Sequence, residues 1–345
     1  MRRISIVVLV IVSMLPMAEL KAQDPQFSQF YAAPLYINPA FTGASGYTRL
    51  GVNYRNQWPN LQSSFKTFSF YMDHFMYKAN SGIGMIITTD REGAAGLKST
   101  SIGGSYAYQL KINDNLVFRP GVQFNYINRN AGFQDLVFAN QIDPISGAID
   151  RTITDPSIAN QDLSISFGDL SVGGVLYSRT LFLGAAVQHL TEPNQSLIDG
   201  SSPLPQRLTI HGGIKLNIGH GPLRKDLTYT YAERSITPVF QYKTQGQFSQ
   251  LDIGAFVHLE PINLGVHYRG VPFKQLNNFP NNEAIIFSVG VTTNNFNIGY
   301  SFDYTVSELG IEAGGAHEFS MTYFLDFNKP VRVPRDRWRL PCPKN

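Results

Sequence analysis

The chain has 345 residues, of which 43% are hydrophobic and only 15% are charged, compared with about 25% charged residues in an ordinary soluble domain. Aromatic residues (12%) and 30 glycines suit pleated strands better than helices, so the composition argues against a helical fold. A net charge of +3 and a single cysteine argue against nucleic-acid binding and exclude an internal disulfide and a cysteine-based zinc site.

Residues 1–22 have the pattern of a cleaved signal peptide. Arg2 and Arg3 precede an apolar run from Ile4 to Leu15, and a small residue, Ala22, ends the segment. This order of charged, apolar and small residues is typical of secretory signals. The apolar run is shorter than the roughly 20 residues of a membrane-spanning helix. We therefore expect an exported chain, with a retained membrane anchor as the less favoured alternative.

Residues 23–46 are predicted to form an N-terminal plug or periplasmic segment. Three prolines interrupt the segment, and its aromatic side chains precede the first predicted strand. Aromatic rings outside a barrel wall need a place to be buried, either in the lumen or against a partner protein. The candidates for plug or partner contacts, including one just after the first strand, are Phe27, Phe30, Tyr31, Tyr36, Phe41 and Trp58.

Residues 47–327 contain segments of about ten residues in which apolar and polar side chains alternate. The segment 207–218 is one example, and residues 295–304 are another. A period of two is typical of a strand with two different faces, and ten residues suit a tilted transmembrane strand. The predicted strands are 47–57, 66–75, 81–90, 99–111, 115–127, 169–178, 180–190, 207–219, 236–244, 248–259, 261–270, 283–293, 295–305 and 315–327.

This pattern predicts an all-β fold, a transmembrane antiparallel β-barrel of about 14 strands. The polar positions are mostly Asn, Gln, Ser, Thr and Gly, as expected for a confined lumen. Five of six connections at one predicted end are short, whereas the other end has longer loops, including 128–168 and 271–282. Outer-membrane barrels have short periplasmic turns and long outer loops. A soluble exported β-protein, such as an adhesin or lectin domain, remains an alternative.

Positively and negatively charged residues, and one histidine, lie at positions that face the predicted lumen. Opposite charges in one channel suggest pairing across the lumen, whereas a conducting constriction would need one sign clustered at one depth. The lumen candidates are Arg49, Arg55, Arg119, Asp252, His267, Arg269 and Asp303.

The sequence contains no catalytic, cofactor-binding or metal-binding motif. Gly82 and Gly84 lie within an alternating strand and precede no predicted helix, so a dinucleotide site is implausible. We expect a protein without enzymatic activity, cofactor or metal. Residues 328–345 form a basic tail that the predicted topology places in the periplasm, and Cys342 lies between two prolines there.

Several blocks of the sequence closely resemble the PorP/SprF family, outer-membrane proteins of the type IX secretion and gliding system of Bacteroidetes. They include QDPQFSQFYAAPLYINPAFTGASG, YRNQWPNL, YKTQGQFSQLDIGAF, LGVHYRG and NIGYSFDYTVSEL. The resemblance extends over nearly the whole mature chain. It implies an outer-membrane barrel that works with the type IX secretion machinery.

The resemblance also implies the partners and the role. Such a barrel supports export or surface anchoring of specific large surface proteins, such as gliding adhesins, which carry a C-terminal sorting domain. The expected partners are that client, the secretion machinery and outer-membrane lipid, without nucleic acid. The alternative function is a passive outer-membrane pore for small solutes, because a 14-stranded wall encloses more space than an eight-stranded one.

Overall fold

The computed structural model describes residues 24–61, 64–93, 96–131, 137, 139–143, 146–150, 164–197, 200–218, 234–276, 279–293, 295–307, 310–325 and 341. The predicted signal peptide (1–22) lies outside the described residues, as does the predicted tail with Cys342, apart from Pro341. No helix within these described ranges is long and apolar enough to cross a bilayer.

Short helical turns lead into a long series of strands. The helical turns are η1 (Phe30–Ala32), α2 (Pro34–Ile37), η2 (Pro39–Phe41), η3 (Tyr77–Ala79), η5 (Ala139–Gln141) and η6 (Ile311–Ala313). The strands are β1 (Thr48–Gln57), β2 (Phe65–Met76), β3 (Ser81–Glu92), β4 (Leu97–Tyr108), β5 (Leu110–Asn113), β6 (Leu116–Asn130), β7 (Ser164–Tyr177), β8 (Leu181–Gln188), β9 (Arg207–Ile214), β10 (Leu216–Asn217), β11 (Arg234–Gln245), β12 (Phe248–Leu259), β13 (Ile262–Leu276), β14 (Phe279–Thr292), β15 (Phe296–Thr305) and β16 (Ala316–Leu325).

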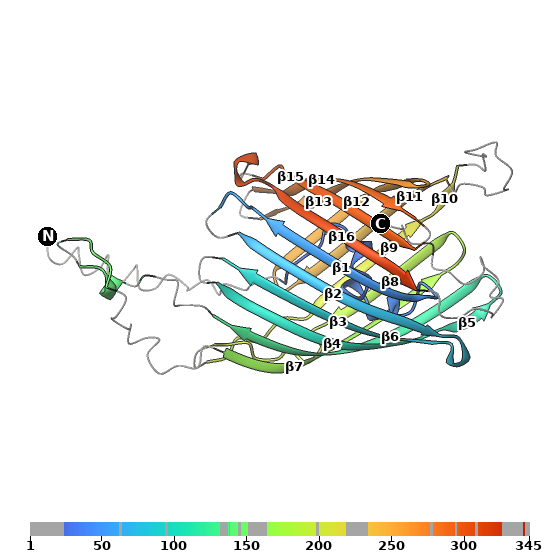
Figure 1. Ribbon diagram of the computed structural model, residues 1–345, viewed down its shortest axis with the longest axis horizontal. Helices are drawn as coiled ribbons and strands as arrows, with labels where there is room; N and C mark the ends of the chain where they lie inside the picture. The colour runs from blue at the N-terminus through green and yellow to red at the C-terminus, as the bar shows by residue number, and fades with distance from the viewer. Residues whose placement is uncertain are drawn as a thin grey trace.

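The strands close into one antiparallel barrel (Figure 1). The first strand, β1, pairs with the last, β16, and β9 pairs with β11. The short β5 follows β4 along β6, and β10 follows β9 along β11. Counting these as continuations, the described residues form a wall of 14 strands. The predicted fold class is therefore confirmed.

The wall is apolar on the outside and polar on the inside. Outward side chains such as those of Ile102, Phe124 and Phe287 are about half exposed, whereas their inward neighbours are buried. Because lipid cannot hydrogen-bond the backbone, only a closed ladder leaves no edge unsatisfied. Residues at other outward positions include Val52, Phe68, Met85, Leu183, Ile253, Val266, Ile298 and Phe319.

The two ends of the barrel differ, and we call them the turn end and the loop end. At the turn end, residues 178–180 connect β7 to β8, and residues 260–261 connect β12 to β13. At the loop end, residues 131–163 connect β6 to β7, and residues 189–206 connect β8 to β9. In bacterial outer-membrane barrels the end with the long loops faces the cell exterior, and we propose the same orientation for this chain.

The predicted loop 271–282 is wrong, because most of it is strand. β13 continues to Leu276, and β14 begins at Phe279. Pro272 and Pro280 favour a loop in the sequence, since proline cannot donate to a ladder. The ladder accommodates them through register shifts, one between Arg269 and Gly270 and another before Gln275.

Placing a charge on the outer wall should destabilise the barrel in lipid. Ile253 is 53% exposed and lies midway along β12, opposite Phe240 and Tyr268. We expect Ile253→Lys to cost about 2–4 kcal/mol of folding free energy, because the ammonium group would face hydrocarbon. Urea titration of the protein folded in lipid vesicles measures this loss. Gln247→Lys, at the exposed tip between β11 and β12, is the control and should change little.

Candidate functional site

The lumen of the barrel is filled by residues 24–47, which we call the plug segment. Figure 1 shows its helical turns inside the wall, behind β1 and β2. Asp24 contacts residues at the loop end, His189 and Arg207. Gly43 contacts Asp73, in the turn-end part of β2. The plug segment therefore runs through the lumen from the loop end towards the turn end before β1 begins.

Aromatic side chains of the plug segment pack against apolar residues that project inward from the wall. The ring of Phe30 lies 6.5 Å from that of Phe256, and the ring of Tyr31 lies 5.5 Å from that of Phe182. The resulting buried cluster consists of Phe30, Tyr31, Ile37, Ala40, Phe41, Val117, Val175, Tyr177, Phe182, Val239 and Phe256.

Five of the six predicted plug or partner candidates thus lie inside the barrel. Phe27 and Tyr36 form an edge-to-face pair, with ring centroids 5.2 Å apart. Phe41 packs on the ring of His211 at 5.1 Å. Trp58 does not join them, because it lies just beyond β1 and packs on Phe65 instead.

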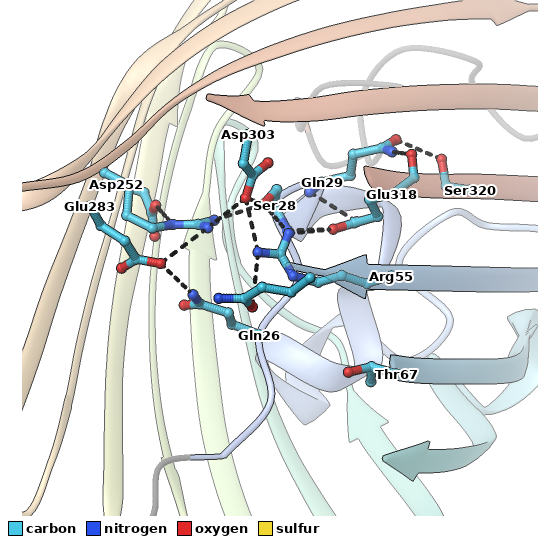
Figure 2. Close-up of polar contacts among 12 residues, drawn as sticks. Gln26, Ser28, Gln29, Arg55, Thr67, Asp252, Glu283, Asp303, Glu318 and Ser320 are labelled. Atoms are coloured by element: carbon cyan, nitrogen blue, oxygen red, sulfur yellow. Dashed lines mark hydrogen bonds and ion pairs between the residues drawn. The ribbon is translucent and has the colours of Figure 1, made fainter. Parts of the chain in front are cut away.

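A central anchor holds the plug segment by buried charges (Figure 2). The carboxylate of Glu318 accepts hydrogen bonds from the backbone N–H groups of Ser28 at 2.6 Å and Gln29 at 3.0 Å. The hydroxyl of Ser28 donates to Asp303 at 2.6 Å. The guanidinium of Arg55 forms ion pairs with both carboxylates, at 2.9 Å from Asp303 and 3.4 Å from Glu318.

The central anchor extends across the lumen through a second arginine. Arg269 is fully buried and pairs with Asp303 at 2.9 Å and with Asp252 at 2.7 Å. It also donates to the hydroxyl of Ser28 at 3.0 Å. Removing one member of a buried ion pair leaves its partner unpaired and costs about 3–5 kcal/mol. These ion pairs join wall residues to one another, and the plug segment joins the network through hydrogen bonds of Ser28.

This central anchor lies on the seam where the barrel closes. Arg55 of β1 is directly opposite Glu318 of β16 in the register of the first and last strands. The plug segment binds both through Ser28 and Gln29. The docked segment therefore braces the pair of strands that makes the wall continuous.

A turn-end anchor holds the last part of the plug segment. Asp73 accepts the backbone N–H of Gly43 at 2.6 Å and pairs with Arg49 at 2.8 Å. Arg119 donates to the backbone carbonyls of Thr42 at 2.5 Å and Ala40 at 3.3 Å. Arginine side chains from β1 and β6 thus donate hydrogen bonds to backbone carbonyls of the plug segment.

The predicted lumen candidates fall into three groups. Arg55, Asp252, Arg269 and Asp303 meet in the central anchor. Arg49 and Arg119 lie apart from them in the turn-end anchor. His267 lies against aromatic rings, 4.5 Å from Phe256 and 5.7 Å from Phe30.

A loop-end anchor holds the start of the described plug segment. Asp24 pairs with His189 at 2.6 Å and Arg207 at 3.0 Å, and His189 also contacts Asp169 at 3.0 Å. Burial alone would lower the pKa of His189, but the two carboxylates outweigh it and raise the pKa to about 9. Burial alone would raise the pKa of Asp24, but His189 and Arg207 hold it well below its usual range.

Asn38 and four inward glycines were missed by sequence reasoning. The side chain of Asn38 caps η2 by accepting the N–H of Ala40 at 2.9 Å, and it donates to wall carbonyls of Gly174 and Ala185. A Cβ at Gly121 would clash with the backbone nitrogen of Ala40. The glycines that admit the plug backbone or side chains in this way are Gly82, Gly121, Gly173 and Gly299.

One sequence signal could have identified the docking surface. Phe182 lies on the parity of β8 that is otherwise small or polar, and Phe256 lies between Gly254 and His258 on the inward parity of β12. A large ring at such a position breaks the alternation, which indicates an inward partner. Glu318 carried no such signal, because a carboxylate suits any polar lumen.

A recess lies between the plug segment and the wall near the loop end. Tyr36 and Asp24 of the plug segment contribute to its lining. Among the described residues, buried Gln123 Oε1 and Arg129 Nε have no hydrogen-bond partner there. The wall contributes hydroxyl, amide and carboxylate groups from Thr88, Asp90, Ser101, Gln123, Asn125 and Ser171. We call this the loop-side recess.

Enlarging an inward glycine should displace the plug segment. We expect Gly121→Ala to cost roughly 1–3 kcal/mol of docking free energy, because the new methyl group would meet the Ala40 backbone. Chymotrypsin should then cleave at the aromatic residues of 24–47 while the barrel stays folded. Gly104→Ala, where nothing lies within 4 Å of the added atom, is the matched control. Equal protection in both variants would contradict the expectation.

The loop-end anchor should depend on pH. Because the folded pKa of His189, about 9, exceeds its usual 6.5, its contribution to stability is complete below pH 6.5 and is lost as pH rises through about 9. Asp24 has a lowered pKa, so its contribution is present above its ordinary pKa of 3.8 and falls at lower pH. The difference in melting temperature between the native protein and His189→Gln should shrink between pH 6.5 and 9.5. A constant difference would contradict this assignment.

Comparison with known proteins identifies the family of this chain. The model of the type IX secretion system membrane protein PorP/SprF matches residues 19–323. The chain is similar to Omp33 of Acinetobacter baumannii (6% identity, 81% of this chain and 98% of that one, TM-score 0.42). It is similar to the P. putida toluene transporter TodX (10%, 84% and 93%, 0.44) and to a Pseudomonas aeruginosa FadL homologue (12%, 84% and 93%, 0.42). No curated protein matches. The chain belongs to the PorP/SprF family of type IX secretion system membrane proteins.

Proposed function

We propose that this barrel binds a segment of a large exported surface protein in its loop-side recess and thereby supports that protein's export or surface anchoring. The barrel acts as a plugged receptor within the type IX secretion machinery, to which its family belongs. The observation that carries the proposal is the lumen filled by residues 24–47, which leaves binding rather than conduction as the use of the interior.

The three anchors support a plug segment that stays in place. They bind it near Asp24, at Ser28 and Gln29, and at Gly43. Displacing the segment would remove the Ser28 hydroxyl from Arg269 and Asp303 and the two backbone N–H groups from Glu318, and buried charged groups would then lack hydrogen bonds that they now make. A passive pore needs a continuous water path, which a segment held along its length opposes.

The chemistry of the loop-side recess suits an extended peptide. Amides and hydroxyls from β3, β4, β6 and β7 line it, and such groups can donate to and accept from a peptide backbone. The unpartnered oxygen of Gln123 and the unpartnered nitrogen of Arg129 would gain hydrogen bonds from a bound segment. Leaving such groups unsatisfied is costly when they are buried. The client would therefore enter from the loop end.

The alternative is a passive pore for small solutes. It requires the plug segment to leave the lumen, and two measurements distinguish the functions. In a planar bilayer, the receptor function predicts no steady conductance from the native protein. In cells, deletion of the gene should remove one large protein from the surface while small-solute uptake continues. Steady conductance together with lost uptake and an intact surface would establish the pore instead.

A substitution that fills the loop-side recess tests the receptor function directly. Gln123→Trp should reduce the client at the cell surface by about tenfold or more, as expected for a loss of at least about 1.4 kcal/mol of binding free energy. Val122→Trp, on the adjacent lipid-facing position, is the control. The amount of barrel in the outer membrane is measured for both variants. If Gln123→Trp inserts normally and retains the client, the recess is not its binding site.

A further inference from the structure

Three basic side chains form a row on the outer surface of the barrel near the loop end. Lys66 of β2 is directly opposite Arg91 of β3, which is directly opposite Lys98 of β4. All three share the outward parity of their strands and are exposed. We call them the cationic row. The register, rather than proximity in the sequence, brings them together.

The cross-strand neighbours at the two ends of the cationic row are neutral amides. Asn56 of β1 is opposite Lys66, and Asn130 of β6 is opposite Lys98. The outward row below is also uncharged and consists of Tyr54, Phe68, Thr89, Thr100 and Asn128. Like charges directly opposite each other in a sheet are destabilising. Three aligned cations also concentrate positive charge on this part of the outer surface, which attracts anions that can contact more than one of them.

The depth of the cationic row in the membrane follows from the rows beneath it. Phe68 and Tyr54 lie one row closer to the middle of the wall, as expected for the aromatic girdle of a barrel. Ile87, Ile102 and Tyr126 follow in the next row. The cations thus lie just above the edge of the hydrocarbon, where the headgroups of the leaflet at the loop end begin.

The cationic row occupies one side of the barrel. The outward positions of β12, β15 and β16, within the part of the chain that the structure describes, carry neither lysine nor arginine. A general preference for the headgroup region would distribute cations around the rim. A patch on three neighbouring strands is instead suited to one bound molecule.

We propose that the cationic row binds the phosphate groups of a phosphorylated glycolipid of the outer leaflet, of the lipid A class. The guanidinium of Arg91 provides a planar set of donors for phosphate oxygens, and the flanking lysines contribute compact charges. The hydroxyls of Thr89 and Thr100, 3.4 Å apart, lie below them as further hydrogen-bonding groups. The acyl chains would lie along the apolar wall beneath. This site is distinct from the lumen and from any client.

The test uses the full-length protein in detergent and the triple variant Lys66→Gln, Arg91→Gln, Lys98→Gln. Binding of diphosphorylated lipid A is compared with binding of the same lipid after dephosphorylation, by native mass spectrometry. We expect the native protein to prefer the diphosphorylated lipid, and the triple variant to bind it at least about tenfold more weakly. Lys78→Gln with Lys111→Gln, on exposed turn-end positions, is the control and should bind as the native protein does.

Further measurements distinguish a lipid site from a site for free phosphate. A heat-dependent shift in gel mobility verifies that the triple variant still forms a barrel. Equal binding of both lipids, an unchanged triple variant, or an equal loss in the control pair would overturn the proposal. Inorganic phosphate is added as a competitor. If it binds the row as tightly as the lipid does, the site is one for free phosphate and the lipid assignment is wrong.

Discussion

The closed backbone ladder is the constraint on which the rest of this structure depends. A strand edge exposed to hydrocarbon would leave N–H and C=O groups without partners, so the last strand must return to the first. The pairing of β1 with β16 accomplishes this closure. Closure also divides the side chains, since alternate residues must face either lipid or lumen. A wall of this size encloses more volume than its own inward side chains would fill. A further segment of the same polypeptide is then needed to close the lumen.

Residues 24–47 supply that chain, and buried charge determines where they lie. Arg55 and Glu318 come from opposite ends of the sequence and face each other across the closing seam. Ser28 and Gln29 bind to this pair, so wall closure and plug docking share the same residues. Buried ion pairs add little net stability compared with apolar contacts, but separating the partners is costly. The aromatic contacts of Phe30 and Tyr31 provide apolar burial, and the hydrogen bonds of Ser28 and Gln29 to the buried carboxylates define the register of the segment.

The same wall presents three chemically different surfaces. The plug segment closes the interior, the loop-side recess offers amides and hydroxyls on its outer side, and the cationic row faces the headgroups. The three surfaces differ in whether they are formed by inward or outward residues, or in their position along the strands. In β3, for example, Asp90 faces the recess and the adjacent Arg91 faces outward. A receptor for an exported protein and a site for a lipid can therefore coexist without sharing a residue.

The sequence alone determined the barrel, because alternation with a period of two is a local property of each strand. It predicted the positions of the strands closely, except where Pro272 and Pro280 concealed the extensions of β13 and β14 and where β7 begins at Ser164, five residues before the predicted start. It also placed Arg55, Arg269 and Asp303 on the inward parity. Only the tertiary structure decided which of these charges meet, because the pairing depends on strand register and on Ser28, which lies 275 residues away from Asp303 in the chain. Strand register also separates Arg119 from the central anchor and brings Lys66, Arg91 and Lys98 into one row, and the alternation within a single strand does not encode the register between strands.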